Sequence, residues 1–166
     1  MGQLNPYPRD LIREGFFHGG TGGVGWIQQE SCFWRRQLWQ KAGPLRTDLR
    51  YAADYELWTR FADHAELYAA STLLGGFSVR GKQNRSIANR GKYLDEVKQA
   101  SKALGQRPGS RQAELRHALS AFNRVKNVPG VRGAMRRLLG LKKLQGPLMR
   151  WDFDEAMYRV VYKPFF

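Results

Sequence analysis

The chain has 166 residues, of which 42% are hydrophobic, so it is long and apolar enough for a folded domain, and general disorder is excluded. Its single cysteine, Cys32, excludes an internal disulfide framework and fits a reducing compartment. No apolar run is long enough to cross a bilayer as a helix, and the first residues lack the apolar segment of a signal peptide. We therefore expect a cytoplasmic protein, either soluble or peripheral at the inner face of the membrane.

The formal net charge of +14 is concentrated in one stretch. Residues 105–150 carry eleven Lys and Arg against one acidic residue, whereas residues 1–104 carry fifteen against ten. Such a basic block indicates an anionic partner, such as a phospholipid surface, nucleic acid or a phosphorylated substrate. A solvated basic surface without a specific partner is an equally good interpretation. Nucleic acid is the less favoured partner, because the aromatic residues gather in residues 16–68, away from this block.

The first 25 residues predict a loop segment, because they are rich in Gly and Pro. Residues 18–25, His-Gly-Gly-Thr-Gly-Gly-Val-Gly, resemble a phosphate-binding loop only in their glycines. They lack the Gly-Lys-Ser/Thr ending that such a loop needs. An active-site loop or a linker is the better interpretation.

The next elements alternate between strands and helices. Residues 26–33 predict an extended strand, and residues 34–42 predict a short helix that ends at Gly43. Residues 54–64 predict an amphipathic helix, since their apolar residues share one face. Residues 67–74 predict a second strand.

The last third of the chain predicts helices. Residues 92–104 and 110–126 have helical apolar spacing, with Ser110 as the N-cap of the second helix. Residues 131–144 combine leucines with Arg and Lys, which is typical of a basic helix at a membrane surface. Residues 157–162 fit either a short strand or a helix end.

Two segments carry a more specific signal. The first is Gln29-Glu-Ser-Cys-Phe-Trp-Arg-Arg-Gln-Leu-Trp-Gln-Lys-Ala-Gly43, and the second is Ala52-Ala-Asp-Tyr-Glu-Leu-Trp-Thr-Arg60. In this order and spacing they resemble the acceptor-side half of family 2 glycosyltransferases of the GT-A type. The resemblance covers about residues 26–86. It implies transfer of a sugar from a nucleotide-sugar donor to a hydroxyl of a glycan or lipid-linked acceptor, with inversion.

Asp54 is the residue of greatest interest. Inverting transfer needs a base that takes the proton of the acceptor hydroxyl, and a carboxylate at a helix N-terminus stays ionised easily. From spacing alone, a helix cap is the simpler role. The resemblance instead gives Asp54 the place of the catalytic base, although Ala53 stands where the family often has Glu. It also implies that Gln28, Gln29, Glu30 and Trp34 bind the acceptor.

The donor side is less complete. Arg80 stands where the family tends to have His, and it would bind the donor phosphates through charge-assisted hydrogen bonds. A GT-A enzyme also holds Mg²⁺ or Mn²⁺ with an Asp-x-Asp motif ahead of the acceptor segment. The only such string here, Asp152-Phe-Asp154, is far downstream and predicts an exposed turn. We therefore expect no metal ligands in this chain, and a nucleotide-binding half supplied from elsewhere.

The overall expectation is an α/β fold, with a short mixed sheet flanked by helices as in the C-terminal half of a GT-A fold. Residues 1–25 would form a loop segment, residues 26–104 the acceptor and base region, and residues 105–166 a basic, mainly helical extension. The second interpretation is a non-enzymatic basic module that binds a membrane surface or nucleic acid.

Overall fold

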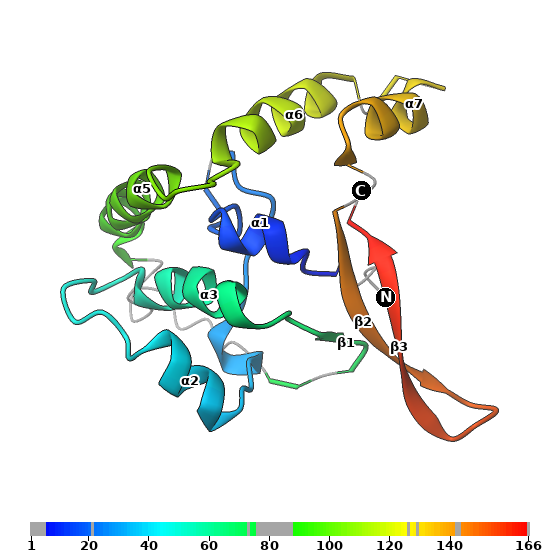
Figure 1. Ribbon diagram of the computed structural model, residues 1–166, viewed down its shortest axis with the longest axis horizontal. Helices are drawn as coiled ribbons and strands as arrows, with labels where there is room; N and C mark the ends of the chain where they lie inside the picture. The colour runs from blue at the N-terminus through cyan, green and yellow to red at the C-terminus, as the bar shows by residue number, and fades with distance from the viewer. Residues whose placement is uncertain are drawn as a thin grey trace.

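The computed structural model describes residues 6–165 apart from 21, 73, 76–87, 126, 129, 142 and 143, and its fold is mixed α/β (Figure 1). In chain order the elements are α1 (Arg9–Arg13), the 3₁₀ helix η1 (Gln29–Ser31), α2 (Arg36–Ala42), α3 (Ala53–His64), β1 (Ala69–Ala70), α5 (Arg90–Gly105), α6 (Gln112–Val125), α7 (Val131–Leu138), β2 (Gln145–Asp152) and β3 (Met157–Pro164). The expected α/β class is confirmed at this level.

Within the described residues the strands form one mixed sheet in the order β1–β2–β3. β1 runs parallel to β2, with Ala69 opposite Leu148, and β2 and β3 form an antiparallel hairpin with Met149 opposite Val160. The hairpin extends away from the helices (Figure 1). Most of the sheet thus comes from residues 145–164, so the expectation of a mainly helical extension is wrong for this part of the chain.

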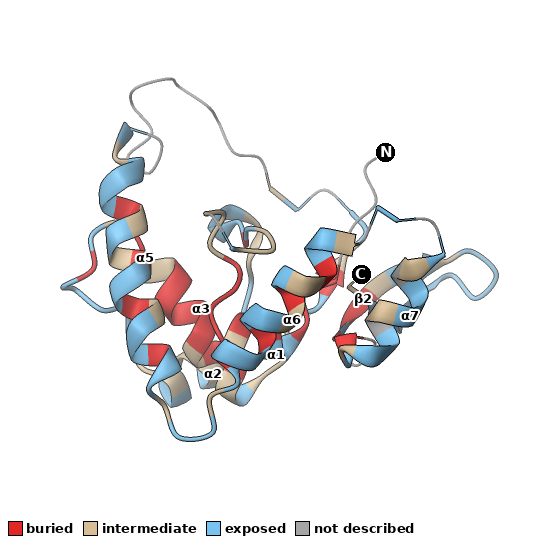
Figure 2. Cartoon of the chain, turned by 90° about the horizontal axis from the view of Figure 1, so that it is seen from above, coloured by how far each residue is buried: buried red, intermediate tan, exposed pale blue. Residues whose placement is uncertain are grey.

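Helix α3 lies at the centre of the helical part. Its apolar side chains are spaced so that one face buries Leu57 and Phe61, and α1 adds Leu11 to the same core. The buried residues gather on α3, α1 and the inward faces of α5 and α6 (Figure 2). Because α3 contacts α1, α2 and α5, it fixes the relative positions of the segments around it.

A second buried cluster joins the start of α3 to α5. Ala52 and Tyr55 pack there with Tyr93, Val97 and Leu104. The helices expected at 54–64, 92–104 and 110–126 are all confirmed within two residues at each end. Their apolar spacing was an adequate guide because each helix buries one face.

The strand expected over residues 26–33 is wrong. The Ser31 and Cys32 N–H groups donate to the carbonyls of Gln28 and Gln29, which closes the 3₁₀ turn of η1. Ile27 is buried, whereas Gln28, Gln29 and Glu30 are exposed. Consecutive polar residues without alternating burial do not suit a strand, so this segment turns instead.

Three other expectations need adjustment. The strand at 67–74 shortens to β1, and the basic helix at 131–144 ends at Leu138, followed by Gly140 in a left-handed conformation (φ 66°). The undecided segment 157–162 lies in β3.

Candidate functional site

The predicted site residues that the structure describes are Gln28, Gln29, Glu30, Trp34 and Asp54. The first three lie in or next to η1, Trp34 lies just before α2, and Asp54 lies in the first turn of α3. Arg80 lies outside the described residues. Three separate segments therefore contribute to the site.

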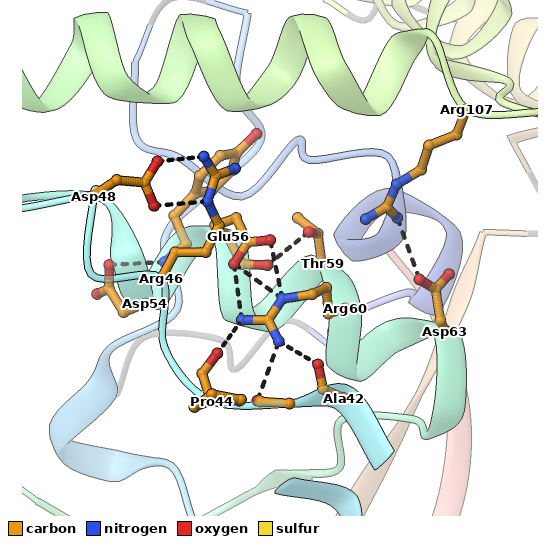
Figure 3. Close-up of polar contacts among 12 residues, drawn as sticks. Ala42, Pro44, Arg46, Asp48, Asp54, Glu56, Thr59, Arg60, Asp63 and Arg107 are labelled. Atoms are coloured by element: carbon orange, nitrogen blue, oxygen red, sulfur yellow. Dashed lines mark hydrogen bonds and ion pairs between the residues drawn. The ribbon is translucent and has the colours of Figure 1, made fainter. Parts of the chain in front are cut away.

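Asp54 is not the N-cap of α3, because that position belongs to Ala52, whose side chain makes no capping hydrogen bond. The Asp54 Oδ1 atom accepts a hydrogen bond of 2.7 Å from the N–H of Tyr55 (Figure 3). The carboxylate is half-buried. Its place in the first turn, at the positive end of the helix, favours a charged carboxylate.

The capping role belongs to Glu96 on α5. Its carboxylate accepts hydrogen bonds from the N–H groups of Arg50, Tyr51 and Ala52, at 3.1, 2.8 and 2.9 Å. These donors immediately precede α3, where unpaired N–H groups are costly. No local sequence signal indicated this contact, since Glu96 is 44 residues from Ala52. Glu96 thus holds the segment that leads into α3, whereas Asp54 accepts the N–H of Tyr55 inside the first turn.

The proton affinity of Asp54 is raised by its surroundings. Burial raises the pKa of its carboxyl above the ordinary value, the hydrogen bond from Tyr55 opposes this, and the charge of Glu30 adds to it. Burial, with help from Glu30 and Asp54, also raises the pKa of Cys32 to about 11. η1 and the start of α3 are therefore close enough for their acidic groups to interact.

The aromatic rings of Trp26 and Tyr93 lie near Asp54, on the side of α5. Trp26 stacks on Tyr93 with ring centroids 5.2 Å apart, and the Tyr93 hydroxyl donates to the carbonyl of His18 at 3.1 Å. Burial is the largest cause of the raised pKa of Tyr93, and the charge of Asp54 adds to it. Trp26, three residues before the first motif, thus belongs to the same neighbourhood as Asp54.

The two motifs are tied together by Arg60, which belongs to the second. Its guanidinium pairs with Glu56 one turn earlier and donates to the carbonyls of Ala42, Gly43 and Pro44 (Figure 3). Those carbonyls end α2, where Gly43 adopts φ 82°. The Glu and Arg of the second motif therefore have a structural role: they fix α2 against α3.

A cavity lies between α2, α3 and the segment after α3, and we call it the aromatic groove. It has a volume of about 750 Å³. Its lining is Arg9, Ile12, Ile27, Cys32, Phe33, Trp34, Arg35, Leu38, Trp58, Phe61, Ala62, His64, Ala65, Glu66, Leu67 and Tyr68. Trp34 lies in it with its ring against Trp39, Trp58 and Phe61.

The structure divides the expected acceptor residues. Trp34 lines the aromatic groove, whereas Gln28 lines a smaller neighbouring cavity of about 420 Å³. Gln29 and Glu30 line neither of these two cavities and are exposed. Asp54 also lines neither. Cys32 borders both cavities and interacts electrostatically with Asp54, so it marks the place where the groove approaches the carboxylates.

The glycine-rich loop is closed on itself. The Gly19 N–H donates to Gly25, the Gly23 N–H donates to Gly20, and the Gly20 N–H donates to Nδ1 of His18. Burial lowers the pKa of His18, which favours its neutral form. Because these amide donors already have partners, they are not arranged to wrap a phosphate, in agreement with the missing Lys-Ser/Thr ending.

Metal ligands do not gather in the part of the chain that the structure describes: no group of three or more His, Cys, Asp or Glu side chains is placed to hold an ion. Asp152 lies at the end of β2, accepts the N–H groups of Asp154 and Glu155, and pairs with Arg159 at 2.9 Å. The expected exposed turn at Asp152–Asp154 is confirmed. These side chains do not fit the Asp-x-Asp role of a donor site.

Part of the basic block is neutralised across the fold. Arg107 pairs with Asp63 at 3.2 Å and Arg111 approaches Asp10 at 4.0 Å, two carboxylates outside the block, whereas Glu114, 2.9 Å from Arg111, belongs to the block itself. None of the described helices has the length and apolarity needed to cross a membrane. The sequence-level excess of charge over residues 105–150 is thus smaller in space, near α1 and α3, than along the chain.

The known proteins offer no further guide. Comparison of the chain with protein-family models, curated proteins and solved structures found no match. The assignment of a function therefore depends on the two motifs, on the carboxylates of Glu30 in η1 and Asp54 in α3, and on the aromatic groove.

Proposed function

We propose that this chain provides the acceptor side and the catalytic base of an inverting glycosyltransferase with a GT-A-like fold. The enzyme transfers a sugar from a nucleotide-sugar donor to a hydroxyl of a glycan or lipid-linked acceptor. The order and spacing of the two motifs support this proposal. So does their physical link, because Arg60 of the second motif binds the carbonyls of Ala42 and Gly43 in the first.

The observation that carries the proposal is the state of Asp54. Its carboxylate is half-buried and its pKa is raised by burial and by Glu30, while Glu96 accepts the N–H groups of residues 50–52 that lead into the helix. A carboxylate with increased proton affinity is a better general base than a solvated one. A purely structural Asp at a helix N-terminus would instead gain from a lowered pKa.

In the proposed reaction, Asp54 accepts the proton of the acceptor hydroxyl while that oxygen forms a bond to the anomeric carbon. The bond from the anomeric carbon to the nucleoside diphosphate breaks, and the diphosphate leaves with the electron pair. Trp34 and Gln28 to Glu30 hold the acceptor, and Arg80 offers a positive charge to the diphosphate. A Mg²⁺ or Mn²⁺ ion on the donor would take its ligands from outside the described residues.

The test compares Asp54→Asn with Asp95→Asn in protein purified from the cells that normally produce it. Nucleoside diphosphate release is measured with a panel of nucleotide sugars and an alkyl glucoside as acceptor. We expect Asp54→Asn to lower the rate by roughly 10²–10⁴-fold, the range for loss of a general base. Asp95→Asn, on the exposed side of α5, should leave the rate within about two-fold, as expected for a surface group away from the site.

Two outcomes would contradict the proposal. One is an Asp54→Asn variant that keeps most of its turnover while remaining folded by circular dichroism. The other is a wild-type protein that releases no nucleoside diphosphate from any donor in the panel.

A further inference from the structure

The aromatic groove is built for an apolar ligand. Twelve of its sixteen lining residues are Ile, Leu, Ala, Cys or aromatic. Its volume of about 750 Å³ lies inside the range of roughly 300–1,000 Å³ that is usual for small-molecule sites. Phe33 and Tyr68 border it with 76% and 47% of their surface exposed. Apolar side chains exposed side by side around a concavity usually mark a binding surface.

One wall of the groove continues the face of α3 that begins at Asp54. Trp58, Phe61 and Ala62 follow Asp54 at spacings of four, seven and eight residues, which places all four on one side of the helix. At the rise of an α-helix, this face extends about 12 Å from Asp54 to Ala62. A molecule lying along it would have one end at the carboxylates and the rest against aromatic rings.

The two ends of the aromatic groove carry different charges, so they favour different ligand groups. Glu30 and Asp54 make the end near Cys32 acidic, so this end disfavours a phosphate or carboxylate and suits a neutral hydroxyl. Arg9, near the other end, already donates to the carbonyls of Ala62 and Asp63. Arg35, the other arginine of the lining, is exposed, and like Arg9 it makes no ion pair within the described residues.

Trp58 adds a polar feature to the apolar wall. Its ring is 93% buried, and its Nε1–H has no hydrogen-bond acceptor among the described residues. A buried donor without a partner is unusual in folded proteins. Because this N–H is itself closed to solvent, a ligand oxygen satisfies it only if the ring turns toward the groove, and an amphiphile with oxygen atoms then gains over a pure hydrocarbon.

We infer that the aromatic groove holds the apolar chain of a neutral, hydroxyl-bearing amphiphile, such as an alkyl glycoside, with its sugar end at Asp54. This inference rests on the proposed function and narrows its acceptor to the lipid-linked class. The groove supplies affinity through apolar burial, and the α3 face aligns the hydroxyl with the base.

The test is a binding series that needs no transfer reaction. Hexyl, heptyl and octyl glucosides are titrated below their micelle concentrations, with binding followed by calorimetry. We expect affinity to rise about four-fold for each added methylene, as apolar burial predicts, and free glucose to show no heat. Octyl phosphate should bind more weakly than octyl glucoside, because its charge faces the acidic end.

Matched variants locate the binding. Phe33 at the groove and Phe153 at the tip of the hairpin are both exposed, at 76% and 87%, so neither substitution removes core packing. Phe33→Ala should weaken octyl glucoside binding about ten-fold, the loss expected for one buried aromatic contact. Phe153→Ala should leave it unchanged. Asp95→Asn, away from the groove, should also leave it unchanged. Binding of octyl glucoside by a protein that transfers no sugar separates failure of the proposed function from failure of this inference.

Several results would overturn the inference. They are no dependence on chain length, equal losses in the two Phe variants, or tighter binding of octyl phosphate. Sedimentation that shows a dimer dispersed by Phe33→Ala would also overturn it, because the groove would then be covered by a second copy of the chain.

Discussion

The helical region around α3 and the β2–β3 hairpin are stabilised in different ways. Around α3, charged side chains join segments that are distant in the chain: Glu96 holds residues 50–52, and Arg60 holds the end of α2. The hairpin is held by its own antiparallel ladder, and β3 is exposed along most of its length. Long-range, partly buried polar contacts specify one arrangement of neighbouring segments, which a site needs and a self-contained hairpin does not.

The apolar residues of the two regions differ in the same way. Phe61 on α3 is 7% exposed and packs against Trp34 and Trp58. Trp151, Tyr158 and Val160 on the hairpin are each more than 40% exposed. The helical region therefore uses its aromatics for the core and the groove, whereas the hairpin leaves most of its own in contact with solvent.

The largest expected effect is a difference in the free energy of unfolding between two phenylalanine variants, one in each region. Phe61→Ala should lower the free energy of unfolding by about 3–5 kcal/mol, because it leaves a cavity beside α3. Phe153→Ala should change it by no more than about 0.5 kcal/mol, as for other exposed positions. Urea unfolding followed by circular dichroism measures both. Similar losses in the two variants would show that the hairpin shares the core, contrary to the comparison.

A smaller effect should come from the polar network. Glu96→Ala should lower the free energy of unfolding by about 2 kcal/mol, because three backbone N–H groups lose a charged acceptor. Asp95→Ala, the adjacent but exposed carboxylate, should cost less than about 0.5 kcal/mol. Glu96→Gln should recover part of the loss, since its carbonyl still accepts. Equal stabilities for the Glu96 and Asp95 variants would contradict the capping role.

The helices were predictable from the sequence for a physical reason. Residues 54–64 and 92–104 each bury one face, so local apolar spacing carries the information. Gly43 also ended α2 as expected, since only a residue tolerant of positive φ suits that position. For the same reason the position of Asp54 in the first turn of α3 could be foreseen.

The rest depended on contacts that local patterns do not encode. β2 contains Gly146 and Pro147, residues that normally argue against a strand, and it forms because β3 and β1 supply its partners. The segment at 26–33 turns because no strand pairs with it within the described residues. No local sequence pattern predicted the hydrogen bonds of Glu96, because its partners are more than 40 residues away.

The central claim is that Asp54 is a base and not merely an acceptor for the first turn of α3, and its own titration tests this most directly. Carbon-detected NMR of the side-chain carboxyl groups would give the pKa of Asp54 in the folded chain. The account predicts a pKa above the ordinary value for Asp, and a decrease when Glu30→Gln removes the neighbouring negative charge. A pKa at or below the ordinary value, unchanged by Glu30→Gln, would contradict it.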